Sequence, residues 1–129
     1  MSYEKPVLQG NFNVAAALAA YVAVQLNSTA DQVALAGANS VNIGFTRVPT
    51  TFVGEDTPII MEGIAQAVVG SGGVSKGNRL KSGTAGEVLA IATSGTTIQQ
   101  ICAIALADGV QYDVIPVLVV HSSERPALA

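Results

Sequence analysis

The sequence has little charge, few aromatic residues and almost no cysteine or histidine. Charged residues make up 12% of the 129 residues, aromatic residues 5%, and tryptophan is absent. The single cysteine excludes an internal disulfide framework and a cysteine-based zinc site. The single histidine argues against most histidine-dependent metal and triad chemistry. The six basic residues are scattered and the net charge is −3, which argues against a nucleic-acid partner.

Small apolar residues are abundant instead. Half of the chain is hydrophobic and the mean hydropathy is +0.47, with the excess in alanine and valine rather than in bulky side chains. A chain of this length buries roughly two-thirds of its unfolded surface, so part of the remaining surface must be apolar. Because contiguous exposed apolar surface marks interfaces, the composition predicts one small domain that packs against other proteins.

The longest apolar stretch, Val14–Val24, covers only about half a bilayer and has Asn13 and Gln25 at its ends. As a signal peptide it lacks a basic start, because Glu4 cancels Lys5. We therefore expect no membrane partner and no export.

Runs of valine and isoleucine between Gly, Asn, Ser and Thr clusters predict an all-β sandwich or barrel. The stretch Val14–Val24 is ambiguous, because its alanines favour one or two helical turns over Ala15–Ala20 while Val22 and Val24 alternate as in a strand. The predicted strands are Tyr21–Leu26, Gln32–Leu35, Val41–Thr46, Thr57–Glu62, Ile64–Val69, Arg79–Lys81, Val88–Ala92, Ile98–Ala107 and Tyr112–Val120.

An internal duplication is visible. Thr29–Val33 matches Thr84–Val88, 55 positions further on, and Val41–Phe45 resembles Gln100–Ile104. A third pair of segments follows, Thr57–Met61 and Asp113–Val117. Two such copies predict a pseudo-symmetric barrel or sandwich within a single β domain, 14–129, with approximate halves 14–65 and 74–120. The alternative is that short hairpins with Thr-Ala-Gly turns resemble one another by chance.

No catalytic constellation emerges from the residue types. His121 lies beside two serines, but geometry rather than adjacency defines a nucleophile and its base, so we expect a polar cap at a strand end. Cys102 stands in an apolar run and is expected to be a buried small hydrophobe. The pair Glu55–Asp56 follows a glycine and reads as a solvated loop.

The glycine-rich segments Gly70–Gly73 and Gly83–Gly86 lack the Gly-Lys-Ser/Thr ending of a phosphate loop and are expected to be hairpin turns. Lys76, Arg79 and Lys81 form the one basic cluster, which favours a solvated or inter-subunit face.

The order of several motifs carries a family likeness. "YVAVQL" is followed by "VALAGANSVNIGF", then by "GIAQAVVGSGGVSKGNRLKSGTAGEVLAIA" and by "ICAIALADGVQYDVIPVLV". Over about residues 14–120 this set resembles the small capsid cement, or decoration, proteins of tailed phages. The sequence departs from that pattern in packing residues, namely Phe45, Asn78 and Ile101–Ala103.

The resemblance implies a pseudo-duplicated β-barrel or sandwich of the β-tulip or β-clip type with an extended N-terminal arm. It implies a non-enzymatic virion protein that binds the outer surface of an icosahedral capsid and stabilises it by bridging major capsid subunits. The implied partners are the major capsid protein and further copies of the chain, a homotrimer ahead of a homodimer, with no cofactor and no metal. Such a protein is made in the host cytoplasm and ends on the capsid exterior.

The N-terminal residues 1–13 have no place in the duplicated core, and we predict that they form an arm that reaches a capsid subunit or a sister protomer. The alternative is a plain first strand or a frayed terminus. The predicted interface residues are Tyr3, Pro6, Val7, Leu8 and Phe12.

A small β-module of the carrier or ligand-binding type is the alternative function. The segment "KGNRLKSGTAGEVLAI" faintly resembles biotinyl or lipoyl carrier domains, whose modified lysine sits on an exposed hairpin tip. Lys76 and Lys81 lack that setting in the sequence.

Overall fold

In a computed structural model of the chain, residues 5–28, 32–91 and 98–124 are described. Within these ranges every regular element is a strand, which confirms the predicted all-β class, and no helix there could cross a bilayer. The strands are β1 (Lys5–Val14), β2 (Ala23–Leu26), β3 (Gln32–Leu35), β4 (Gly44–Thr46), β5 (Asp56–Val68), β6 (Arg79–Ser82), β7 (Val88–Ala90), β8 (Gln99–Ala105) and β9 (Val114–Glu124).

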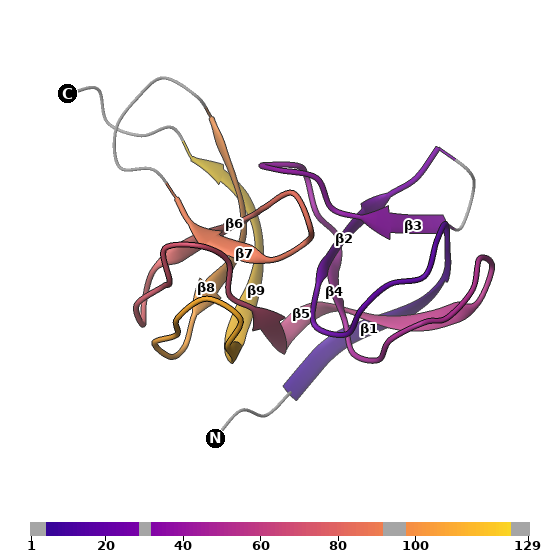
Figure 1. Ribbon diagram of the computed structural model, residues 1–129, viewed down its shortest axis with the longest axis horizontal. Helices are drawn as coiled ribbons and strands as arrows, with labels where there is room; N and C mark the ends of the chain where they lie inside the picture. The colour runs from indigo at the N-terminus through magenta and orange to yellow at the C-terminus, as the bar shows by residue number, and fades with distance from the viewer. Residues whose placement is uncertain (1–4, 29–31, 92–97, 125–129) are drawn as a thin grey trace.

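The first five strands close into a barrel. Hydrogen-bonded neighbours run in the order β1-β3-β2-β4-β5, and β5 pairs back onto β1 in antiparallel register. The parallel contact of β1 with β3, at Asn13–Gln32 and Val14–Val33, completes the circuit. Figure 1 shows this barrel as the lobe that carries β1, β2, β3 and β4.

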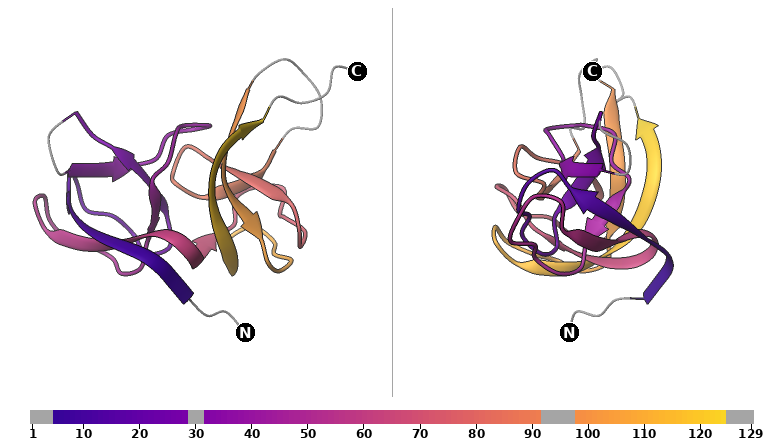
Figure 2. Two further views of the ribbon diagram at one scale, coloured as in Figure 1. Left: turned by 180° about the vertical axis from the view of Figure 1, so that it is seen from behind. Right: turned by 90° about the vertical axis from the view of Figure 1, so that its right-hand side faces the viewer.

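The second barrel reuses β5 as its first strand. Beyond Gly63, β5 pairs with β9, and the order continues through β8 and β6 to β7. An isolated parallel bridge between Val69 and Val88 returns β7 to the end of β5. Seen from behind in Figure 2, β5 again runs from one lobe to the other, so a single long strand joins the two barrels.

The strand pairings confirm the predicted duplication. The bridge Val14–Val33 recurs as Val69–Val88, with both residues shifted by 55 positions. The hydrogen bonds that follow these bridges also match, because Ala15 N donates to Val33 O and Gly70 N donates to Val88 O, both at 2.9 Å.

The second predicted correspondence, of Val41–Phe45 with Gln100–Ile104, is confirmed by the pairing of β4 with β2 and of β8 with β6. Phe45 pairs with Ala23 of β2, and its counterpart Ile104 pairs with Arg79 of β6. The third predicted correspondence is wrong by two residues, because Phe45 pairs with Ile60 whereas Ile104 pairs with Leu118. Since side chains alternate along a strand, a shift of two residues leaves every side chain on its predicted face.

The described part of the predicted arm is a strand of the first barrel. Residues Lys5–Asn13 of β1 pair with Ile64–Asp56 of β5, with register shifts near Leu8. Phe12 packs against the core cluster that contains the fully buried Val14. The alternation of inward-facing residues at the end of β1 therefore holds this segment in the sheet, which differs from the predicted arm over residues 1–13.

Two local predictions also differ from the structure. The predicted strands Thr57–Glu62 and Ile64–Val69 form one strand, because at Gly63 the backbone takes a φ of +99° and pairs with β1 on one edge and β9 on the other. Residues 15–22 form neither a helix nor a strand.

Small residues fill both barrels. The larger core cluster consists mostly of alanine and valine, and its one aromatic side chain is the fully buried Phe45. Gly44 is required beside Phe45, because a Cβ there would collide with the Ile60 carbonyl group and lie 2.8 Å from Ile59 Cγ2. A five-stranded barrel has a narrow interior, which the small side chains suit.

Backbone and side-chain hydrogen bonds tie the two barrels together. Ala23 N donates to Gly86 O at 2.8 Å, and Ser82 Oγ donates to Gly37 O at 2.7 Å. Asn39 Oδ1 accepts from Gln100 N at 2.7 Å. Because these bonds link β2 and the loop after β3 to the second barrel, the lobes are held by more than the shared strand.

Candidate interaction surface

The residues predicted to contact partners differ in their exposure to solvent and in whether the structure describes them. Tyr3 lies outside the described residues, and Pro6 and Val7 lie in β1 with side chains that are not described. The Leu8 side chain is 46% exposed, whereas Phe12 packs against the smaller core cluster. Leu8 is therefore the described member of this set that remains available to a partner.

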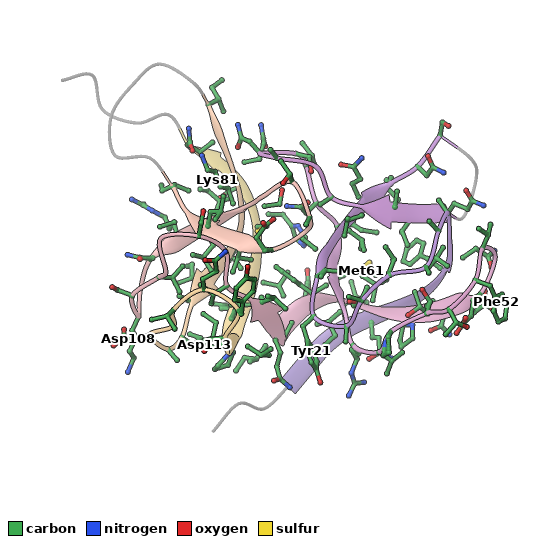
Figure 3. All side chains as sticks on the ribbon, viewed as in Figure 1. Tyr21, Phe52, Met61, Lys81, Asp108 and Asp113 are labelled. Carbon is green, nitrogen blue, oxygen red and sulfur yellow. The ribbon has the colours of Figure 1, made fainter. Side chains whose placement is uncertain are left out.

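Further exposed apolar residues lie in the turn that leads from β4 to β5. Phe52 and Val53 are 63% and 65% exposed, and Val48 of the same loop is 47% exposed. Figure 3 places Phe52 at the end of the first barrel that lies farthest from the second. An apolar pair at the tip of a barrel is well placed for contact with a neighbouring molecule.

Hydrogen bonds hold this turn in one conformation. Glu55 Oε1 accepts from Thr51 N at 3.0 Å and from Thr51 Oγ1 at 3.2 Å. Gly54 N donates to Val14 O at 2.9 Å, which ties the tip to β1. The hydrogen bonds from Thr51, the backbone bond first, lower the pKa of the Glu55 carboxyl group below its usual value. A preorganised apolar tip loses little conformational freedom when it binds.

The second barrel has an equivalent turn between β8 and β9. Asp113 N donates to Val110 O at 3.0 Å, as Glu55 N does to Phe52 O at 3.4 Å. In each turn the third residue has a positive φ, +86° at Gly54 and +75° at Tyr112, which is the type II geometry. Val110 and Tyr112 are 69% and 78% exposed, so both turns present apolar side chains to solvent.

Sequence reasoning missed both turns as contact surfaces. A signal was present in the first, where Phe52 and Val53 stand directly before Gly54 in a segment without strand character. In the second turn no glycine marks the left-handed position, because Tyr112 occupies it.

Cys102 and His121, the residues weighed as catalytic candidates in the sequence, make structural contacts in the fold. Cys102 is 2% exposed, as predicted, and burial raises the pKa of its thiol to about 12. With its proton on Nε2, His121 donates to Met61 O at 2.8 Å. Met61 lies between the β5 residues paired with β4 and those paired with β9, and His121 lies within β9 rather than at its end. The described residues contain no cluster of three or more His, Cys, Asp or Glu that could hold a metal ion.

The lysines considered for a carrier module lie in different settings. Lys81 is part of β6 and its Nζ donates to Gln99 Oε1 at 2.9 Å, so it does not stand on a hairpin tip. Figure 3 shows Lys81 on the second barrel. Lys76 is exposed in the turn before β6, where its backbone N donates to Asp108 Oδ1 at 2.7 Å.

No protein-family model matches the chain, and no curated protein matches it either. Among solved structures, the chain is similar to the crystal structure of the head fiber gp8.5 N base in bacteriophage phi29, with a TM-score of 0.68 and 16% sequence identity. The similarity covers 92% of this chain and 98% of that chain. At this identity the comparison shows a shared fold, and it extends over both barrels.

Proposed function

We propose that the chain is a structural protein of a bacteriophage head that binds the outer surface of the capsid and stabilises it by bridging major capsid subunits. The observation that carries the proposal is the fold shared with a head fiber base over nearly the whole of both chains. The motif order in the sequence, which resembles capsid cement proteins, supports the same conclusion independently of the strand arrangement.

The surface chemistry supports a contact role. The chain has few charges, and two of its turns carry exposed apolar residues, Phe52 and Val53 at the tip of the first barrel and Val110 and Tyr112 on the second barrel. Capsid binding by many copies needs only a modest contact from each, because their contributions combine over the shell. Phe52 is the proposed anchor, since buried aromatic side chains carry a large share of binding energy at interfaces.

The proposal includes self-association, with a homotrimer ahead of a homodimer, and no enzymatic activity. The protein is made in the host cytoplasm and ends on the exterior of the virion. Light scattering of the purified protein, alone and with capsids, measures the oligomeric state directly. A monomer that stays monomeric under both conditions contradicts the self-association part.

Co-sedimentation with empty shells of the major capsid protein encoded by the same genome tests the binding role. We expect saturable binding of the natural chain and, for Phe52→Ser, a loss of about tenfold in affinity, which corresponds to one hot-spot residue. Leu8→Ser tests the predicted β1 interface in the same assay. Val41→Ser is the control, because Val41 is 70% exposed but lies outside both surfaces. A natural chain that stays in the supernatant contradicts the proposal.

A further inference from the structure

A small slot lies where the end of β5 meets loops from both barrels. It encloses about 160 Å³, room for one side chain rather than for a drug-sized ligand, whose sites enclose about 300–1,000 Å³. Val22, Val68, Val69 and Ala85 supply apolar walls. Among the described residues that line the slot, Glu87 is the one charged residue and Tyr112 is the one aromatic residue.

The Glu87 carboxylate is held at this slot by close packing. Its stem passes Gly70, where an added Cβ would come within 2.6 Å of Glu87 Cγ. Glu87 Oε1 accepts from Ala85 N at 2.9 Å, and no donor to Oε2 occurs in the described parts of the chain. The slot is therefore lined by a negatively charged residue, held in place beside apolar walls.

Tyr112 stands in a backbone conformation that costs free energy. Its φ is +75°, whereas the equivalent turn of the first barrel has Gly54 at this position. Side chains other than glycine resist this region, and such strain concentrates at ligand sites. A hydrogen bond of 2.9 Å from Tyr112 N to Val69 O holds the residue in place while its side chain stays 78% exposed.

A second tyrosine repeats this arrangement next to the slot. Tyr21 precedes the lining residue Val22 and has a φ of +64°. Its carbonyl oxygen accepts from Val68 N at 3.0 Å, one residue before the carbonyl that holds Tyr112. The end of β5 thus holds two tyrosines with positive φ, of which Tyr112 lines the slot and Tyr21 precedes the lining residue Val22.

We propose that this slot binds a basic side chain, arginine ahead of lysine, from a protein partner. The aliphatic stem of arginine lies against the valine walls, as long basic side chains do on apolar surfaces. The planar guanidinium stacks on the ring of Tyr112 and donates to the carboxylate of Glu87. The net charge of −3 favours the approach of such a partner. This inference does not depend on the capsid role, because the slot is complete within one chain.

Titration with N-acetyl-arginine amide, followed by amide NMR shifts, tests the proposal on the full chain. We expect saturable shifts at Gly70, Ala85 and Glu87 with a millimolar dissociation constant. N-acetyl-citrulline amide, a neutral molecule of nearly the same shape, is expected to bind about tenfold more weakly, as is the arginine probe to Glu87→Gln. Absence of shifts at these residues, or equal binding of the two probes, overturns the proposal.

The Tyr112→Gly variant distinguishes a binding role of the Tyr112 side chain from a structural one, because it should weaken arginine binding while it stabilises the fold. We expect the urea midpoint of unfolding to rise, since glycine accepts the positive φ, while arginine binding falls at least severalfold. Tyr112→Phe keeps the ring and the strained backbone and is expected to bind as the natural chain does. Unchanged binding by Tyr112→Gly overturns the role of the ring.

Discussion

One pair of equivalent positions in the two barrels holds a polar residue in the first barrel and an apolar residue in the second. Thr57 pairs with Phe12 in the first barrel, and Ile115 pairs with Ala67 at the corresponding place in the second. Thr57 is fully buried, and its Oγ1 has no hydrogen-bond partner among the residues that the structure describes. An unpaired buried hydroxyl group destabilises a fold, and the second barrel avoids this by using an apolar side chain.

Replacing Thr57 by valine should therefore raise the free energy of unfolding by about 1 kcal/mol. The matched control is Thr46→Val, which should lower the free energy of unfolding by about 1–3 kcal/mol. Thr46 is equally buried, but its Oγ1 accepts from Val22 N and donates to Ala19 O. Urea denaturation at unchanged m-value measures both effects. A destabilised Thr57→Val variant contradicts the assignment of an unpaired hydroxyl group.

The Glu55 carboxylate makes the first-barrel turn sensitive to acid. Because its pKa is lowered from 4.5 in the folded protein, its stabilising contribution is complete above that value and is lost as the pH falls through the folded pKa. Glu55→Gln should destabilise the protein at neutral pH, and the difference from the natural chain should shrink in acid. Unfolding measured from pH 7 down to pH 3 tests this prediction. A difference that is independent of pH contradicts it.

At the scale of elements, local sequence patterns predicted most strands but not their continuity. Gln32–Leu35 was predicted with the observed ends, because clear turn residues precede it. The continuity of β5 through Gly63 was missed, since a glycine with positive φ looks locally like a break while pairing on both edges keeps the strand extended. The role of β1 was missed for a similar reason, because its partner in β5 lies about fifty residues away.

The position of β1 changes the expected result of shortening the chain. Deletion of residues 2–12 removes most of β1, including Phe12 and the strand that pairs with one edge of β5. We expect the first barrel to lose its protection against hydrogen exchange, since its circuit is opened and its core exposed. The probes are the amides of Val24 and Val33, with Ala103 in the second barrel as the internal comparison. Native protection of Val24 and Val33 in the shortened chain contradicts this prediction and supports a free arm.

At the scale of the whole molecule, the duplication was predictable and the contact surface was not. Valine and glycine patterns repeat along the chain, so the sequence alone aligns Val33 with Val88, and the strand pairings place both at equivalent bridges. Exposure depends on packing between distant segments, which leaves Phe52 and Tyr112 on the surface and packs the partly buried Phe12 against the core of the first barrel. The same packing brings Val22 and Tyr112 to one slot, although ninety positions separate them.

The central proposal for the whole molecule is that this chain is a bound structural subunit of a phage head. Electron microscopy of empty capsid shells mixed with excess protein tests this claim most directly. We predict added density on the outer surface at symmetry-related positions, with two lobes that fit the two barrels and with the Phe52 turn or Leu8 at the shell. Shells that remain bare at protein excess would contradict the account.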